Sequence, residues 1–247
     1  MNDIAAKYST CYAQQAGTNF FNVVATAPTS SEIATTTLNN QSATSAGTSK
    51  VYHVIGLNKY YSNSSCTTEI TSITKPSKTG YTFGGYYTST GGSGTQYITS
   101  AGAFTNSLYT KASQTLYAKW TANTYTLKIN PNGGTYGGSS SVHTSSTKLT
   151  YGGTTHSSIS PIPVRTGYTF KGYYTAASGG TQLYNSSGAC IKGTSYWDSN
   201  GKYCHAGDMT LYAQWTAKSY TFTINPNGGI FGASSEPTIY TNLIYGA

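Results

Sequence analysis

The side chains that most often perform catalysis are scarce in this sequence. Only 6 of the 247 residues are acidic, and none stands at a repeated strand end, where a glycoside hydrolase would pair two carboxyl groups. The acidic residues are Asp3, Glu32, Glu69, Asp198, Asp208 and Glu236. The histidines are equally scattered, and neither a Gly-x-Ser-x-Gly nor a His-Glu-x-x-His motif occurs. We therefore predict a non-enzymatic protein without a cofactor.

The 4 cysteines are the remaining reactive side chains. Cys11, Cys66, Cys190 and Cys204 are even in number and have no Cys-x-x-Cys spacing, which favours disulfides over a metal site. Cys190, Cys204 and His205 also lack an evident fourth ligand for zinc. We predict a bridge between Cys190 and Cys204, which leaves Cys11 to pair with Cys66, although the sequence permits three connectivities. Disulfides indicate an oxidising compartment.

The segment between Cys190 and Cys204 holds the candidate partner-binding residues, Tyr196, Trp197, Asp198 and Tyr203. A Trp displayed on a stapled loop is a typical anchor for a protein partner. The alternative interpretation is that Trp197 folds back to cover the segment. Asp198 begins an Asp-Ser-Asn-Gly run that resembles the start of a calcium loop, but the other ligands are missing, so we predict a turn.

The charge pattern argues against nucleic acid as a partner. The formal net charge is +8, yet the 14 basic residues are scattered singly, and the excess arises because acidic residues are few. Loose, salt-sensitive attraction to an anionic cell wall or glycan is the more natural consequence.

The composition favours many short strands over helices. Gly (28 residues) and Tyr (24 residues) are abundant, which excludes a coiled coil or helical bundle and predicts a β-rich chain. No apolar run is long enough to cross a membrane, and residues 1–17 lack the apolar region of a signal peptide. Helical spacing of Ile4, Tyr8 and Cys11 predicts a short N-terminal helix. We expect an extracellular protein whose leader and anchor lie outside these residues.

Internal repeats define the organisation. The motif Gly80-Tyr-Thr-Phe-Gly-Gly-Tyr-Tyr-Thr88 recurs with one change at residues 167–175. The stretch from Leu116 to Gly134, which reads Leu-Tyr-Ala-Lys-Trp and later Asn-Pro-Asn-Gly-Gly, returns at residues 211–229. A degenerate turn at residues 37–43 stands where residues 128–134 stand in the next copy.

These repeats predict four segments along the chain. They are an N-terminal helix and linker (1–34), repeat unit 1 with a degenerate start (35–122), repeat unit 2 with an insertion (123–217) and a truncated unit 3 (218–247). Because unit 3 contains only opening strands, it cannot enclose a core of its own.

Alternation within each copy predicts which side chains face the core. Leu116, Ala118 and Trp120 fall on one face of their strand, and Trp215 takes the place of Trp120 in the second copy. In each Tyr-Tyr pair, at 86–87 and 173–174, one ring points inward and one outward. The Asn-Pro-Asn-Gly-Gly segments predict tight structural turns rather than phosphate cradles, because no helix follows them.

The motifs Gly-Tyr-Thr-Phe, Leu-Tyr-Ala-x-Trp and Asn-Pro-Asn-Gly-Gly together resemble the internalin B-repeat, or Listeria-Bacteroides repeat, family over about residues 35–247. Tyr86 and Tyr173 stand where that family usually has Trp. The resemblance implies tandem β-grasp-like (ubiquitin-like) domains, making an α+β chain with the N-terminal helix, in a bacterial surface or secreted protein. It further implies a spacer, adhesion or protein-interaction role. The alternative is a carbohydrate-binding module with exposed Tyr and Trp. The expected partners are a host or cell-wall protein or a glycan.

Overall fold

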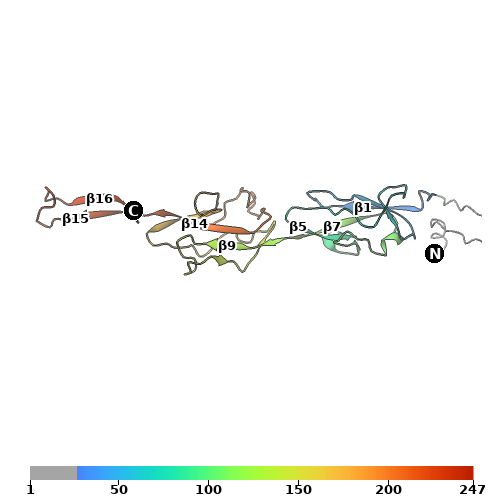
Figure 1. Cartoon of the computed structure of the whole chain (residues 1–247), viewed down its shortest axis with the longest axis horizontal. Coiled ribbons are helices and arrows are strands. Elements are labelled where there is room, and N and C mark those ends of the chain that lie inside the picture. Colours follow the sequence, from blue (N-terminus) through green and yellow to red (C-terminus); the bar gives the residue numbers. More distant parts are fainter. Residues whose placement is uncertain (1–26, 247) are drawn as a thin grey trace, which may run out of the picture. The chain divides into compact units, whose positions relative to one another are not determined.

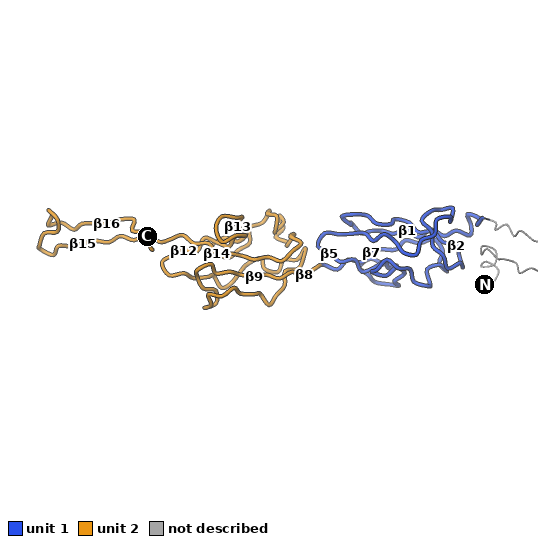
Figure 2. Tube along the Cα trace, viewed as in Figure 1, with its two compact units in different colours: residues 1–122 blue, residues 123–247 orange. Residues whose placement is uncertain are grey.

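The computed structural model describes residues 27–246, and the chain divides into two compact units between Ala122 and Asn123 (Figures 1 and 2). The predicted N-terminal helix and Cys11 lie outside the described residues. The described chain is β-rich, as predicted, and its helical content consists of two short 3₁₀ turns, η1 (Thr90–Gly92) and η2 (Leu108–Thr110). No helix among residues 27–246 is long and apolar enough to span a membrane.

Unit 1 contains one mixed seven-stranded sheet in the order β4-β3-β2-β1-β7-β5-β6. The strands are β1 (Ile33–Asn39), β2 (Lys50–Val54), β3 (Tyr60–Tyr61), β4 (Glu69–Ile70), β5 (Tyr81–Tyr87), β6 (Gln96–Ile98) and β7 (Gln114–Ala122). The first and last of them, β1 and β7, are parallel neighbours, with Leu38 opposite Leu116. The other pairs are antiparallel.

Unit 2 repeats the central part of this sheet in the order β10-β9-β14-β12-β13, with β9 and β14 parallel. The strands of this sheet are β9 (Leu127–Asn130), β10 (His143–Thr144), β12 (Tyr168–Tyr174), β13 (Gln182–Tyr184) and β14 (Met209–Ala217). A small second pair joins β8 (Thr124–Tyr125) to β11 (Leu149–Thr150).

The cores follow the alternation seen in the sequence. Leu116 and Ala118 are buried, and Trp120 packs against the same cluster while remaining partly exposed. Trp215 has the same partly buried position against the unit 2 core. Tyr86 and Tyr173 are completely buried, so the inward ring of each Tyr-Tyr pair is the first one. A β-bulge at Gly85 and Gly172, with φ of 105° and 138°, keeps both rings on the core face.

The Asn-Pro-Asn-Gly-Gly segment of unit 2 is a tight turn, as predicted. The Gly134 N–H bonds to the Pro131 carbonyl at 3.0 Å, and Asn132 and Gly133 adopt φ of 48° and 85°. In unit 1 the same left-handed step is taken without glycine, at Gln41 (φ 50°) and Ser42 (φ 57°). The turn is therefore retained where its sequence signature is degenerate.

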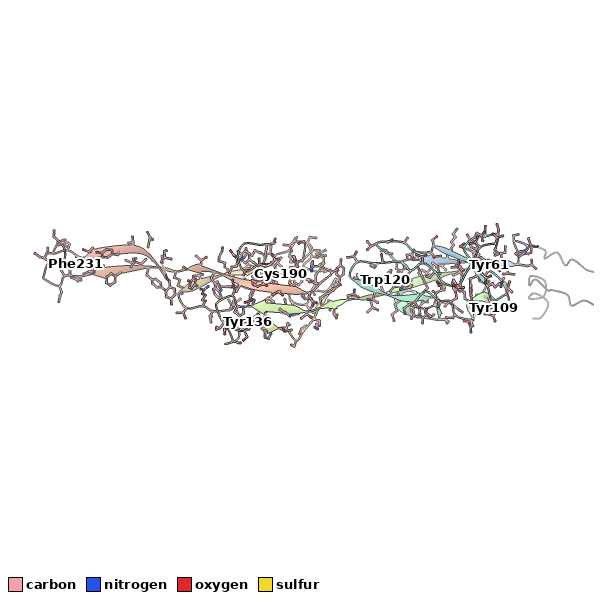
Figure 3. The ribbon with its side chains drawn as sticks, viewed as in Figure 1. Tyr61, Tyr109, Trp120, Tyr136, Cys190 and Phe231 are labelled. Atoms are coloured by element: carbon pink, nitrogen blue, oxygen red, sulfur yellow. The ribbon has the colours of Figure 1, made fainter. Side chains whose placement is uncertain are left out.

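The C-terminal segment forms a two-stranded antiparallel hairpin from β15 (Ser219–Ile224) and β16 (Thr238–Ile244) (Figure 1). Its large apolar side chains are exposed, including Phe222 at 54% and Ile239 at 61%. Phe231 lies at the tip of this hairpin (Figure 3). The hairpin thus encloses no core, as expected of a segment that contains only two strands.

Candidate functional site

The predicted disulfide between Cys190 and Cys204 is not formed. Cys66, Cys190 and Cys204 are all free thiols, and Cys11 lies outside the described part of the chain. Cys190 is held by a main-chain bond to the Ser157 carbonyl (2.9 Å), whereas Cys204 is held by one to the Tyr196 carbonyl (2.9 Å). Burial raises the pKa of all three thiols, which disfavours the thiolate that disulfide chemistry and metal binding require.

The segment that the disulfide was expected to staple is closed by packing instead. Trp197 pairs with Tyr203 in an antiparallel bridge, and their rings meet edge to face at 5.3 Å. The Trp197 ring also contacts Tyr184 at 5.9 Å. Both Trp197 and Tyr203 are completely buried, so the segment is a hairpin that extends the unit 2 core. Figure 3 labels Cys190 within this unit.

The burial of Trp197 contradicts the interpretation that this side chain is displayed to a partner. The interpretation that holds is the alternative one, in which Trp197 folds back over the insertion. Asp198 forms the turn of the hairpin, because its Oδ1 accepts the N–H groups of Asn200 (2.9 Å) and Lys202 (2.8 Å). Tyr196 is half-buried and stacks on His205 with ring centroids 4.4 Å apart. Among residues 27–246 no group of three or more potential metal ligands forms.

The structure brings together a different set of side chains, which we call the cation–tyrosine pairs. At one end of each main sheet a cation lies over a Tyr ring: Lys78 over Tyr81 at 4.7 Å in unit 1, and Arg165 over Tyr168 at 3.8 Å in unit 2. All four side chains are half-buried. Cations at such distances from a ring are attracted by its quadrupole.

A second pair lies on the outward ring of each Tyr-Tyr dipeptide. Lys119 of β7 lies 5.7 Å from the Tyr87 ring, and Lys171 of β12 lies 5.7 Å from the Tyr174 ring. The cation therefore comes from different strands in the two units but covers equivalent tyrosines.

The residue at position 84 or its equivalent accounts for the change in the strand that supplies the cation. In unit 1 a Cβ at Gly84 would lie 3.0 Å from Lys119 Cδ, so glycine leaves room for the Lys119 stem. In unit 2 the equivalent of Gly84 is Lys171 itself, and Gln214 replaces Lys119. Gln214 turns away to donate to the carbonyls of Ala176 (3.0 Å) and Gly179 (2.6 Å). Alternation predicts that one ring of each Tyr-Tyr pair points outward, but it reveals neither which ring that is nor which cation covers it.

Unit 2 also contains a pocket of about 780 Å³ beside the Arg165–Tyr168 pair. The pocket lies between the turn at 133–135, the segment 163–166 and the start of the C-terminal hairpin. Tyr168, Trp215 and Tyr245 provide its aromatic walls, and Arg165 and Lys218 provide its charges. A hollow of about 510 Å³ shares Arg165, Tyr168 and Trp215 with it and adds Lys171 and Tyr174.

The two glycines of the Asn-Pro-Asn-Gly-Gly turn position this pocket. A Cβ at Gly133 would lie 3.2 Å from the Arg165 guanidinium carbon, and one at Gly134 would lie 2.4 Å from the Trp215 ring. The indole Nε1 of Trp215 donates to the carbonyls of Pro131 (3.2 Å) and Asn132 (3.0 Å). The turn therefore fixes both Arg165 and Trp215 by close backbone approach.

Comparisons with known proteins agree with the repeat pattern. A family model described as the Listeria-Bacteroides repeat domain matches residues 39–119 and 125–193. Internalin H of Listeria monocytogenes is 33% identical over 157 residues, which are 62% of this chain and 22% of that protein.

Two similar proteins come from Evansella cellulosilytica. A putative Gly-rich membrane protein is 29% identical over 153 residues, 62% of this chain and 16% of its own length. A putative membrane protein is 32% identical over 158 residues, 63% of this chain and 19% of its own length. The aligned region thus spans less than a quarter of each relative.

Proposed function

The chain belongs to the Listeria-Bacteroides repeat family, and from this premise we propose that its two units form a non-enzymatic adhesion or protein-interaction module of a bacterial surface or secreted protein. Relatives named as an internalin and as putative membrane proteins support a location at the cell surface. Each unit is a β-grasp-like domain in this proposal. A mixed sheet whose first and last strands are parallel neighbours supports that fold.

The observation that carries the proposal is the retained cation on the outward tyrosine. A cation lies over both Tyr87 and Tyr174 although the strand that supplies it changes, which supports a shared role for this pair of groups. Tyrosine rings and cations held on a rigid sheet are favourable anchors for a partner, because little side-chain entropy is lost on binding. Two equivalent anchors in tandem would also gain from bivalent attachment.

Adhesion of beads that carry the full chain tests this proposal, with bacterial cell-wall sacculi and host epithelial cells as targets. The double variant Tyr87→Ala/Tyr174→Ala removes the outward tyrosine ring from both units. The matched control is Thr121→Ala/Thr216→Ala, which changes equivalent exposed positions on β7 and β14. We expect at least one target to hold the parent and the control equally and to release the tyrosine variant. Equal adhesion of both variants would exclude Tyr87 and Tyr174 as anchors, and no adhesion to either target would exclude the adhesive role.

A carbohydrate-binding module is the second candidate function. The specific observation that favours it is the pocket in unit 2, where aromatic walls stand beside basic groups. Sugar rings pack their C–H faces against such aromatic side chains, and the polar rim fixes their orientation.

A further inference from the structure

In unit 2, Arg165 is held between an aromatic ring and a backbone turn without a carboxylate partner. Its guanidinium lies between the Tyr168 ring, 3.8 Å away, and the turn backbone at Gly133. Among residues 27–246 no ion pair involves Arg165, and no Asp or Glu lines either hollow that it borders. A guanidinium presents five N–H donors in a planar fork that matches a carboxylate.

Lys78, the residue of unit 1 equivalent to Arg165, has a hydrogen-bond acceptor. Lys78 donates from Nζ to the main-chain carbonyl of Gln41 at 3.3 Å and lies 5.9 Å from the Trp120 ring. In unit 2 the corresponding turn carbonyl, that of Asn132, accepts the indole N–H of Trp215 instead. Arg165 is thus positioned by the turn while its donors are left for another acceptor.

The surroundings of Arg165 fit a sugar ring as well as an anion. The rings of Tyr168 and Tyr245 meet nearly at right angles with centroids 5.6 Å apart, and Tyr245 is 41% exposed. Thr135, Ser140 and Thr166 add hydroxyl groups to the same lining, and Lys218 adds a second positive charge. A volume of about 780 Å³ is enough for a short oligosaccharide.

From this arrangement we infer that the pocket bordered by Arg165, Tyr168, Trp215, Lys218 and Tyr245 binds an acidic saccharide. The saccharide carboxylate pairs with the Arg165 guanidinium, and the sugar face packs on the aromatic wall. This inference rests on the proposed surface role and names a ligand class for it. Single-stranded nucleic acid is a poorer fit, because the chain has one pocket arginine and no basic run along a groove.

Calorimetric titration of the full chain in about 0.15 M salt tests the site, because exposed charges farther apart than about 8 Å are screened there. The probes are hexagalacturonate, neutral maltohexaose and a thymidine hexanucleotide. We expect hexagalacturonate to bind at least ten-fold more tightly than either of the others. Equal binding of maltohexaose would overturn the requirement for an acidic ligand, and equal binding of the oligonucleotide would overturn the saccharide class, because it would show general attraction to anions.

Two variants distinguish binding by the pocket arginine from attraction by the net charge of the chain. Arg165→Gln should weaken hexagalacturonate binding at least ten-fold, while Lys202→Gln, an exposed site outside the pocket with the same charge change, should alter it less than two-fold. Arg165→Lys should give an intermediate loss with an unchanged melting temperature, which excludes misfolding as the cause. Equal affinities of Arg165→Gln and Lys202→Gln would overturn the site. A chain that adheres to sacculi or cells but ignores hexagalacturonate would overturn this inference alone and leave the adhesive role standing.

Discussion

The Tyr86 hydroxyl donates a hydrogen bond to the side-chain oxygen of Asn40 in unit 1. Tyr173 is the equivalent residue of unit 2, and its buried hydroxyl has no partner among the described residues. The reason is that Pro131 occupies the place of Asn40, as the tryptophans show: Trp120 Nε1 donates to the Asn40 carbonyl and Trp215 Nε1 to the Pro131 carbonyl. The equivalent tyrosine hydroxyl is thus hydrogen-bonded in unit 1 and has no partner among the described residues in unit 2.

The two hydroxyls should therefore respond oppositely to removal. Tyr86→Phe is expected to destabilise unit 1 by about 1 kcal/mol, because the Asn40 side chain loses its donor. Tyr173→Phe is expected to be neutral or stabilising, because it removes an unsatisfied buried group. Amide exchange of β7 and β14 reports the opening free energy of each unit separately. Equal destabilisation by the two substitutions would contradict the assignment of partners.

Trp197 should behave as a core residue. Trp197→Ala is expected to cost unit 2 about 3–5 kcal/mol, as other large aromatic truncations do. Trp197→Phe and Trp215→Phe make the same change in ring size, but only the second breaks hydrogen bonds. Trp197 Nε1 has no partner among the described residues, whereas Trp215 Nε1 donates to two carbonyls. The hydrogen-bond part of the destabilisation should therefore be absent from Trp197→Phe. In a Trp120→Phe/Trp215→Phe background, acrylamide should quench Trp197 fluorescence only weakly. Strong quenching would restore the displayed-anchor interpretation.

Cys190 and Cys204 should be recovered as thiols. Denaturation without reductant, followed by alkylation and peptide mapping, is expected to label both residues. Before denaturation the labelling at pH 7 should be slow and should accelerate with pH, because burial raises both thiol pKa values. A linked peptide pair in the unreduced sample would contradict the structure.

His53 should make unit 1 sensitive to mild acid. Its ring is buried, Nε2 lies 2.8 Å from the Lys111 carbonyl, and Nδ1 has no partner among the described residues. Desolvation lowers the pKa of this imidazole in the folded chain, although the Lys111 bond partly opposes the shift. The unfolded chain therefore binds the proton first, so the stability is complete above about pH 6.5 and is lost as the pH falls through the lower folded pKa.

Amide exchange of β7 at pH 7 and pH 5 measures this loss. His53→Gln keeps a donor for the Lys111 carbonyl but cannot titrate, so it should flatten the difference between the two pH values. An unchanged pH dependence in that variant would assign the effect to other groups.

The β15–β16 hairpin should be the least protected sheet of unit 2. Its two strands expose their apolar side chains, and an isolated two-stranded hairpin is marginally stable in water. Amides of Tyr220–Ile224 are expected to exchange much faster than those of Leu211–Trp215. Equal protection in a monomer would show that the hairpin has a core that the structure lacks.

The sequence alone determined the features that depend on local period. Alternation of side chains on a strand has a period of two, so the shared face of Leu116, Ala118 and Trp120 was predictable, as was one inward and one outward ring in each Tyr-Tyr pair. Which of the two rings points inward depends on the β-bulge at Gly85 and Gly172, which alternation does not encode. The repeat itself located the turns, since Pro fixes φ and Gly permits the positive φ that a tight turn requires.

Only the tertiary structure decided the features that depend on distant partners. Whether Trp197 faced a partner or the core depended on its contacts with Tyr184 and Tyr203, which alternation does not encode. The expected Cys190–Cys204 bridge was wrong because even number and spacing cannot give the positions of two thiols in space. Arg165 became a candidate ligand-binding group only when the fold placed it between the turn at Gly133 and the ring of Tyr168, in two hollows whose linings contain no Asp or Glu.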